Sequence, residues 1–163
     1  MRLRRWLIAA VGCFLLVSII GLAAAAGWFY WDRVETRAEQ SARALLPQLA
    51  SKEIPEVFAY DYQTVERSLA EAYPLLTPAY RQEFQKSANA QIIPEAKKRE
   101  VVVQANVVGV GVMTAKRDSA SVMVYLNRTV TDKSRQPLYD GSRLRVDFKK
   151  IGDKWLIAYI TPI

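Results

Sequence analysis

The sequence contains no histidine and only one cysteine, Cys13, and these two deficits exclude several kinds of chemistry. Structural zinc sites take most of their ligands from cysteine and histidine, so a zinc site is close to excluded, and no disulfide can form within the chain. The absence of histidine also removes Ser-His-Asp triads, Cys-His pairs and imidazole acid–base catalysis. The sequence therefore predicts no metal site and no cofactor, and it shows no sign of an enzyme.

Acidic residues are absent before Asp32, and this absence marks out the first segment of the chain. Residues 6–31 carry no charge, and three arginines precede them. As a helix at about 1.5 Å per residue the run is about 39 Å long, enough to cross a hydrocarbon core of about 30 Å. Aromatic residues stand at both ends, as they do at membrane interfaces. The pattern predicts a basic cytoplasmic tip at 1–5, a transmembrane helix at 6–31 and an extracytoplasmic domain at 32–163.

Two other interpretations of the first segment remain open. A cleavable signal peptide would use the small residues 24–26 as its cleavage site, but the apolar region of a signal peptide is usually about 7–15 residues long. A lipoprotein site at Cys13 would leave only residues 6–12 as the apolar region. The length of the run favours an uncleaved anchor, and the expected location is the plasma membrane, with a single pass and the domain outside the cytoplasm.

The periodicity after the anchor is helical and ends near residue 94. Apolar residues recur every three or four positions over Val34–Leu49 and predict a helix that Pro55 ends. A short amphipathic helix follows. Thr77 and Pro78 then predict the start of another helix, with the threonine as N-cap, and Pro94 predicts its end.

Beyond residue 100 the periodicity is that of strands. Four strands are expected, at 101–113, 121–131, 142–150 and 154–160. In the third, Leu144, Val146 and Phe148 share one face. Connections this short favour an antiparallel meander, and Gly109 and Gly111 predict a bulge that curls the sheet. The expected class is α+β: helices packed on a curved antiparallel four-stranded sheet.

Four short motifs resemble, in order, landmarks of the Mce-associated membrane proteins, accessory proteins of the actinobacterial "mammalian cell entry" lipid-import systems. The motifs are Tyr60-Asp61-Tyr62, the TPAYRQEF run at 77–84, Asn127-Arg128-Thr129-Val130 and the GDKWLI run at 152–157. The chain departs from the family at Asn127-Arg128, where an aspartate-glutamine pair is common, and at Gly152-Asp153, where the order is often reversed. The resemblance implies a cone-shaped domain similar to the NTF2-like or cystatin-like folds. It also implies an accessory, non-catalytic role in a complex that imports lipids or sterols, with Mce proteins as partners.

Tyr60, Asp61 and Tyr62, together with Trp155, are the candidate pocket residues. A carboxylate base beside a tyrosine oxyanion donor would suit an isomerase of the ketosteroid type. The alternative for the first three is a helix cap between two packing aromatics, and the alternative for Trp155 is core packing.

Arg143, Arg145 and Lys149 form the candidate docking face, because they alternate along the outer side of the third predicted strand. They would meet an acidic partner or anionic headgroups, or remain a solvated face. The basic residues of the chain are scattered among acids, so no nucleic-acid partner is expected.

The main functional hypothesis is therefore an accessory subunit of an Mce-type lipid or sterol importer. The first alternative is a VirB8-like scaffold component of a secretion machine, since similar folds occur there behind a single membrane helix. The second alternative is a small-molecule-binding or isomerase-like domain. The sequence leaves open the lipid, the partner subunit and the oligomeric state.

Overall fold

A computed structural model of the chain describes the backbone of residues 2–163 and most of the side chains. The side chains of residues 2–17, 19, 24, 25, 29 and 32 lie outside the described residues. The chain divides into two compact units, Met1–Ala38 and Glu39–Ile163. The first unit is helical from Arg2 onward and is part of the long helix α1 (Arg2–Phe58). The last turns of α1 belong to the second unit.

The predicted transmembrane helix at 6–31 falls largely on side chains that lie outside the described residues. Among the residues that are described, no helix is long and apolar enough to cross a membrane.

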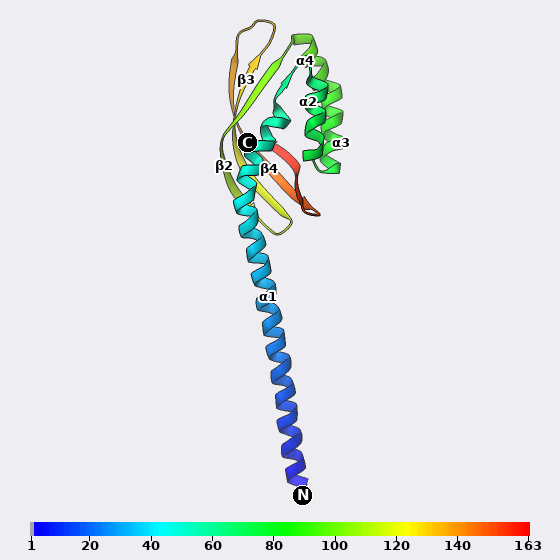
Figure 1. The fold of residues 1–163 in the computed structure, drawn as a ribbon, viewed down its shortest axis with the longest axis vertical. Coiled ribbons are helices and arrows are strands. Elements are labelled where there is room, and N and C mark those ends of the chain that lie inside the picture. The colour runs from blue at the N-terminus through cyan, green and yellow to red at the C-terminus, as the bar shows by residue number, and fades with distance from the viewer. Residues whose placement is uncertain (1) are drawn as a thin grey trace. The chain divides into compact units, whose positions relative to one another are not determined.

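The second unit has helices and an antiparallel sheet in the expected order (Figure 1). After α1 come β1 (Tyr60–Asp61), α2 (Val65–Ala72), the 3₁₀ turn η1 (Tyr73–Leu75), α3 (Pro78–Ser87), the π-helical turn η2 (Ala88–Ile92), α4 (Ile93–Arg99), β2 (Val102–Ala115), β3 (Ser119–Thr131), β4 (Leu138–Ile151) and β5 (Lys154–Pro162). The predicted α+β class and the meander of four long strands are confirmed.

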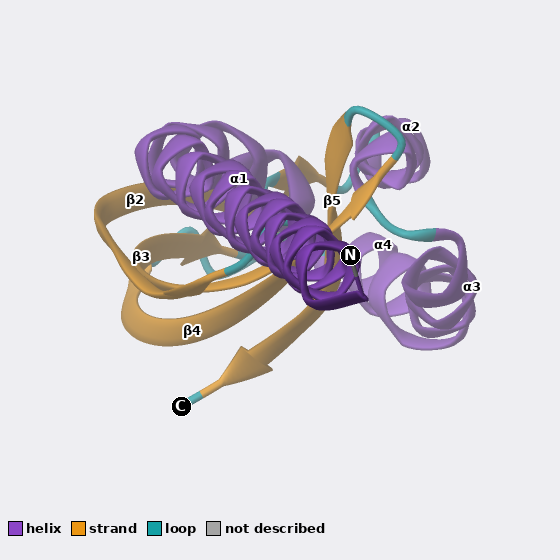
Figure 2. Ribbon diagram, turned by 90° about the horizontal axis from the view of Figure 1, so that it is seen from below, coloured by secondary structure: helices purple, strands orange, loops and turns teal. Residues whose placement is uncertain are grey.

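The sheet has five strands rather than the four expected, in the order β1-β2-β3-β4-β5. The additional strand, β1, has only two residues, which pair with Val102 and Val103, and a strand this short has no periodicity to detect. The pairing of β2 with β3 shifts register between Val107 and Gly109 and again between Val112 and Thr114. The predicted bulge is therefore present, and Figure 2 shows β2, β3 and β4 curving together.

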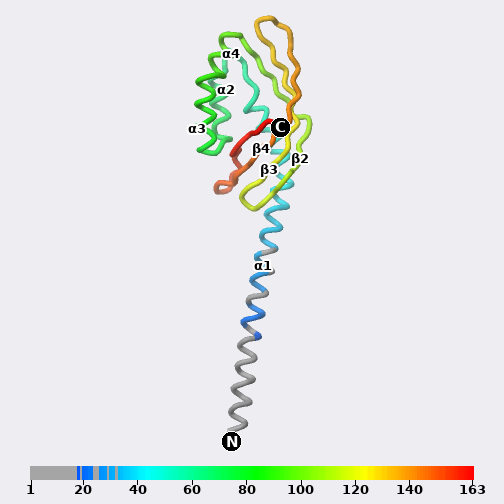
Figure 3. Tube along the Cα trace, turned by 180° about the vertical axis from the view of Figure 1, so that it is seen from behind, coloured from blue at the N-terminus to red at the C-terminus, as the bar shows by residue number. Residues whose placement is uncertain are grey.

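The last part of α1, from Ala42 to Phe58, fills the concave face of this sheet. Its apolar stripe repeats every three or four residues and is almost fully buried: Ala42, Leu46, Ala50, Ile54 and Val57. The stripe shares one core cluster with inner-face residues of β3, β4 and β5, including Val124, Val146, Phe148 and Ile157. A second, smaller cluster forms where α2 and α4 meet β2, around Leu69, Ala96 and Val103. Figure 3 shows α2, α3 and α4 grouped beside the strands.

Two helix boundaries differ from the prediction because proline did not end the helix. Helix α1 continues through Pro47 and Pro55 to Phe58, since each proline removes one N–H but the apolar stripe beyond Ala50 is still buried. Pro94 is the second residue of α4, which directly follows the π-helical turn η2, and the helical backbone continues through it. The chain turns away only after Arg99, where Glu100 has a left-handed backbone (φ 54°). The predicted cap is present, because the Thr77 hydroxyl accepts from the Tyr80 N–H at 3.4 Å.

One acidic residue of α1, Glu53, is buried. Glu53 is 8% exposed, and its Oε2 has no hydrogen-bond partner among the described residues. Burial, and secondarily the charge of Glu56, raises the pKa of Glu53 to about 7 from 4.5. The folded protein therefore holds a proton at this carboxyl that the unfolded chain releases between these two pH values.

Stability is expected to fall as the pH rises from about 4.5 to 7, because the folded state binds the extra proton in this range. At about 1.36 kcal/mol per pKa unit the loss is on the order of 3 kcal/mol. The Glu53→Gln variant, neutral at every pH, should lose this slope in urea unfolding followed by circular dichroism, whereas the exposed control Glu71→Gln should keep it. An unchanged slope in Glu53→Gln would show that other groups cause the dependence.

Candidate functional site

Arg128 of β3 places a charged side chain on the inner face of the sheet, between the apolar Leu126 and Val130. It lies directly opposite Asp140 of β4, and its Nε donates to Asp140 Oδ2 at 3.1 Å. Its Nη2 donates to the same oxygen, and the Ser142 hydroxyl donates to it at 3.0 Å. The guanidinium also lies over the Phe58 ring, 5.9 Å from its centre. These contacts fix the guanidinium in one orientation.

The electrostatics of this pair follow from its hydrogen bonds. The bond from Arg128, and then that from Ser142, holds the pKa of Asp140 below its usual value. Tyr60 lies close by, and burial raises the pKa of its phenol while the Arg128 charge opposes the rise. The site at neutral pH thus contains an ion pair and a neutral phenol.

Two hollows open on the inner side of the sheet, and Arg128 lines both. The larger, about 560 Å³, lies between the strands and α4 and is walled mainly by apolar side chains such as Ile92, Val103 and Val130. The smaller, about 260 Å³, is lined by Phe58, Tyr80, Phe84, Leu126, Leu144, Ile160 and Pro162, with Ser142. The larger volume is within the usual range for ligand pockets.

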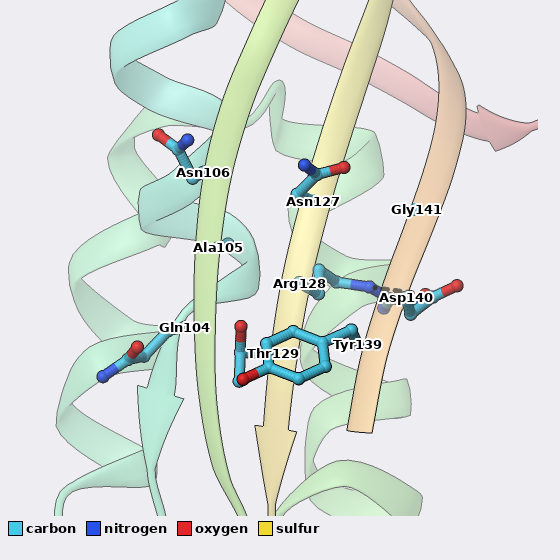
Figure 4. Close-up of a pocket in the computed structure, with 9 residues that line it drawn as sticks. All are labelled: Gln104, Ala105, Asn106, Asn127, Arg128, Thr129, Tyr139, Asp140 and Gly141. Atoms are coloured by element: carbon cyan, nitrogen blue, oxygen red, sulfur yellow. Dashed lines mark hydrogen bonds and ion pairs between the residues drawn. The ribbon is translucent and has the colours of Figure 1, made fainter. Parts of the chain in front are cut away.

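A third concavity, of about 530 Å³, lies across β2, β3 and β4 and is predominantly polar (Figure 4). Gln104, Asn106, Asn127, Thr129, Tyr139 and Gly141 line it, and Arg128 and Asp140 reach it as well. Arg128 therefore lines all three depressions, and Asp140 lines the larger hollow and the polar concavity.

The structure brings only part of the predicted pocket set to this region. Tyr60 lines the larger hollow. Asp61 is engaged in a turn, where its carboxylate accepts from the Gln63 N–H at 2.9 Å, and the Tyr62 hydroxyl accepts from the Gln63 side chain at 3.2 Å. Trp155 is buried in the main core on β5, whereas Tyr60 and Tyr62 pack against the second cluster.

The predicted docking residues lie together on the outer face of β4. Arg143, Arg145 and Lys149 are exposed and alternate with the buried Leu144, Val146 and Phe148. Arg145 donates to Asp147 at 3.0 Å, and Asp147 also accepts from the Ser121 hydroxyl. Arg143 is paired across the sheet with Tyr125, which is 47% exposed. The outer face is thus basic, with an aromatic residue at its centre.

The Arg128–Asp140 pair was not predicted from the sequence. Each residue occupies an inward position at the end of a strand, but only the register of β3 against β4 places them opposite each other. Among the described residues, no group of three or more acidic or cysteine side chains is arranged to hold a metal ion.

Comparison with known proteins gives distant relatives and a clear fold likeness. No family model matches the chain. "Outer membrane protein Rv1973" of Mycobacterium tuberculosis is 26% identical over 144 residues, which cover 88% of this chain and 90% of the relative. An IcmL-like type IV secretion system protein from Legionella pneumophila has a TM-score of 0.63 at 15% identity, covering 74% of this chain and 93% of that chain.

Two further solved structures have the same arrangement. The periplasmic domain of DotI has a TM-score of 0.63 at 12% identity, covering 74% of this chain and 94% of that domain. The VirB8 protein of Agrobacterium tumefaciens has a TM-score of 0.54 at 12% identity, covering 68% and 84%. Helices packed on a curled antiparallel sheet, an NTF2-like fold, are therefore common to this chain and to VirB8-like domains.

These findings correct the main functional hypothesis. The solved structures that share this fold include an IcmL-like type IV secretion system protein and VirB8, so the expected accessory role in Mce-type lipid import is wrong. The motifs behind the Mce resemblance mark a helix cap, a turn and strand ends. The fold itself requires such features, so they indicate the fold more than the partner.

Replacing Arg128 by Met is expected to raise the pKa of Asp140 toward its ordinary value, because two hydrogen bonds to Oδ2 are lost. The stability that the pair contributes is present above the unfolded pKa of the aspartate and is lost as the pH falls through the lower, folded value. Carboxyl ¹³C NMR titration measures the shift. The control Arg145→Met removes the partner of Asp147 and should leave Asp140 unchanged; an unmoved Asp140 pKa in Arg128→Met would contradict the assignment.

Proposed function

We propose that this protein is a non-catalytic assembly subunit of the VirB8 type, which holds components of a secretion machine in the bacterial envelope through protein–protein contacts. The observation that carries the proposal is the fold likeness, which extends over nearly the whole length of the IcmL-like protein and of the DotI domain. The first is named a type IV secretion system protein and the second a periplasmic domain, and the proposal extends the secretion role of the first to the present chain. We place the domain outside the cytoplasm, as the charge distribution at the N-terminus predicts.

The chemistry of the candidate site supports a structural role for its acids. Asp61 stabilises a turn and Asp140 is bonded to Arg128 and Ser142, so each carboxylate has a local structural partner. A general base would instead have to be aimed at a substrate atom from within a cavity. Assembly rather than catalysis is the function that these contacts favour.

The outer sheet face is the surface proposed for docking. The inner face of the sheet packs against α1 in the core, whereas Tyr125, Arg143 and Lys149 are exposed. Aromatic and arginine side chains are enriched at protein interfaces. The basic charge of this face fits an acidic surface on the partner.

A photo-reactive benzoylphenylalanine at position 125 should therefore cross-link the full-length protein to an envelope component in living cells, because Tyr125 lies at the centre of the docking face. The same probe at the exposed Glu71 of α2 is the matched control. The products are identified by mass spectrometry, and components of a secretion machine are expected from position 125 and not from position 71.

Charge reversal then tests the basis of the contact. Arg143→Glu combined with Lys149→Glu should reduce the cross-link several-fold, and Arg67→Glu on α2 should not. Docking through this face would be ruled out if both probe positions gave the same cross-linked products. It would also be ruled out if the charge reversal left the cross-link yield unchanged.

A further inference from the structure

Strand β4 is longer than the strand that pairs with its outer edge. Its pairing with β5 begins at Leu144, opposite Pro162, and runs to Ile151. From Leu138 to Ser142 it pairs with β3 on one side, and in the described part of the chain no strand pairs with the other. Figures 1 and 3 show the β3–β4 hairpin extending beyond the C-terminal end of β5, and in Figure 4 β4 is the outermost strand beside Asp140.

The orientation of the backbone on this stretch follows from one hydrogen bond. The Arg143 carbonyl accepts from the Ile163 N–H at 2.9 Å, so the backbone groups of Arg143 face the β5 side. Backbone groups in an antiparallel strand alternate between its two edges, and the β3–β4 register is regular from Leu138 to Lys149. The N–H and C=O of Tyr139 and of Gly141 therefore point to the open edge.

This edge lacks the protection found on the opposite side of the sheet. The free edge of β2 is interrupted by two register shifts, a common means of preventing edge pairing. The β4 segment has no such irregularity against β3, and it carries two large exposed side chains, Leu138 (66%) and Tyr139 (76%). An unpaired strand edge with exposed apolar residues is a template for another strand.

Depressions on both faces adjoin this edge. The 260 Å³ inner hollow reaches Ser142 and Pro162, and the 530 Å³ outer concavity reaches Tyr139 and Gly141. Side chains of an added strand would alternate between these two faces. In strand addition, main-chain hydrogen bonds give the affinity and such pockets give the specificity.

The charge at the edge favours an acidic segment. Arg143 is exposed on the outer face, and Asp140, the acid on this stretch of β4, is already bonded to Arg128. A glutamate or aspartate beside Arg143 would form a favourable cross-strand pair.

We propose that the Leu138–Ser142 edge of β4 binds an extended segment of a partner protein as a sixth strand. The segment has apolar side chains facing the inner hollow and acidic side chains near Arg143. This site goes beyond the proposed function, because it names a peptide-binding edge that shares only Arg143 with the docking face centred on Tyr125, and it stands whether or not the partner belongs to a secretion machine.

Gly141 provides a matched pair of variants for the test. In Gly141→Pro the lost N–H faces the open edge, so pairing with β3 is retained while the added strand loses a donor. In Gly141→Ala the N–H stays, and the new Cβ would lie 3.6 Å from Asn127 Oδ1, an ordinary contact. The probe is a fluorescein-labelled TVEVTVEVT peptide, with a version N-methylated at alternate residues as its control.

Wild type and Gly141→Ala should bind the probe within about twofold of each other, and Gly141→Pro about tenfold more weakly, as the loss of one hydrogen bond implies. The N-methylated peptide should bind about as weakly to wild type. Hydrogen exchange on wild type gives a test that needs no variant: the amides of Tyr139 and Gly141 should exchange fast in the free protein and slowly with the probe, while those of Asp140 and Ser142 stay slow throughout.

Equal binding by Gly141→Pro, equal binding of the N-methylated peptide, or no protection of Tyr139 and Gly141 at saturating probe would overturn the proposal. So would a failure of wild type to bind the probe at all. A concentration-dependent dimer in sedimentation that Gly141→Pro abolishes would identify a second copy of this chain as the occupant, and would overturn the assignment to a partner protein.

Discussion

The packing of the α1 stripe against the concave face of the sheet is the interaction on which the rest of the domain depends. Ala42, Leu46, Ala50, Ile54 and Val57 supply one side of the main core, and the inner faces of β3, β4 and β5 supply the other. A sheet whose inner face is filled in this way presents its outer face and its free edges to partners. The two proposed contact surfaces are these remaining surfaces.

The end of α1 also explains where the polar site lies. The inward positions of β3 are apolar up to Leu126, within reach of the α1 stripe, and the next inward residue is Arg128. Phe58, the last residue of α1, packs on that guanidinium. Asp140 and Ser142 of β4 accept hydrogen bonds from it. The ion pair thus lies between the main core under α1 and the second apolar cluster around Val103 and Val130.

Much of the fold could be predicted from the sequence, because alternation in β4 and the Thr77 cap are local signals. The two-residue strand β1 and the continuation of α1 past Pro55 could not, since both are decided by packing against distant residues. The Arg128–Asp140 pair could be predicted only with knowledge of the register between β3 and β4. The open edge of β4 could be predicted only with knowledge of where β5 ends. The functional hypothesis was wrong because motifs at caps and turns resemble one another among proteins that share a fold.

The most direct test of this account compares two neighbouring leucines of α1. Leu46 is fully buried in the stripe, whereas Leu45 is 48% exposed. The account predicts that Leu46→Ala lowers the free energy of unfolding by about 2–5 kcal/mol, and that Leu45→Ala lowers it by only about 0.5 kcal/mol, in urea titrations of the purified protein. Equal losses at the two positions would contradict the claim that this stripe of α1 holds the domain together.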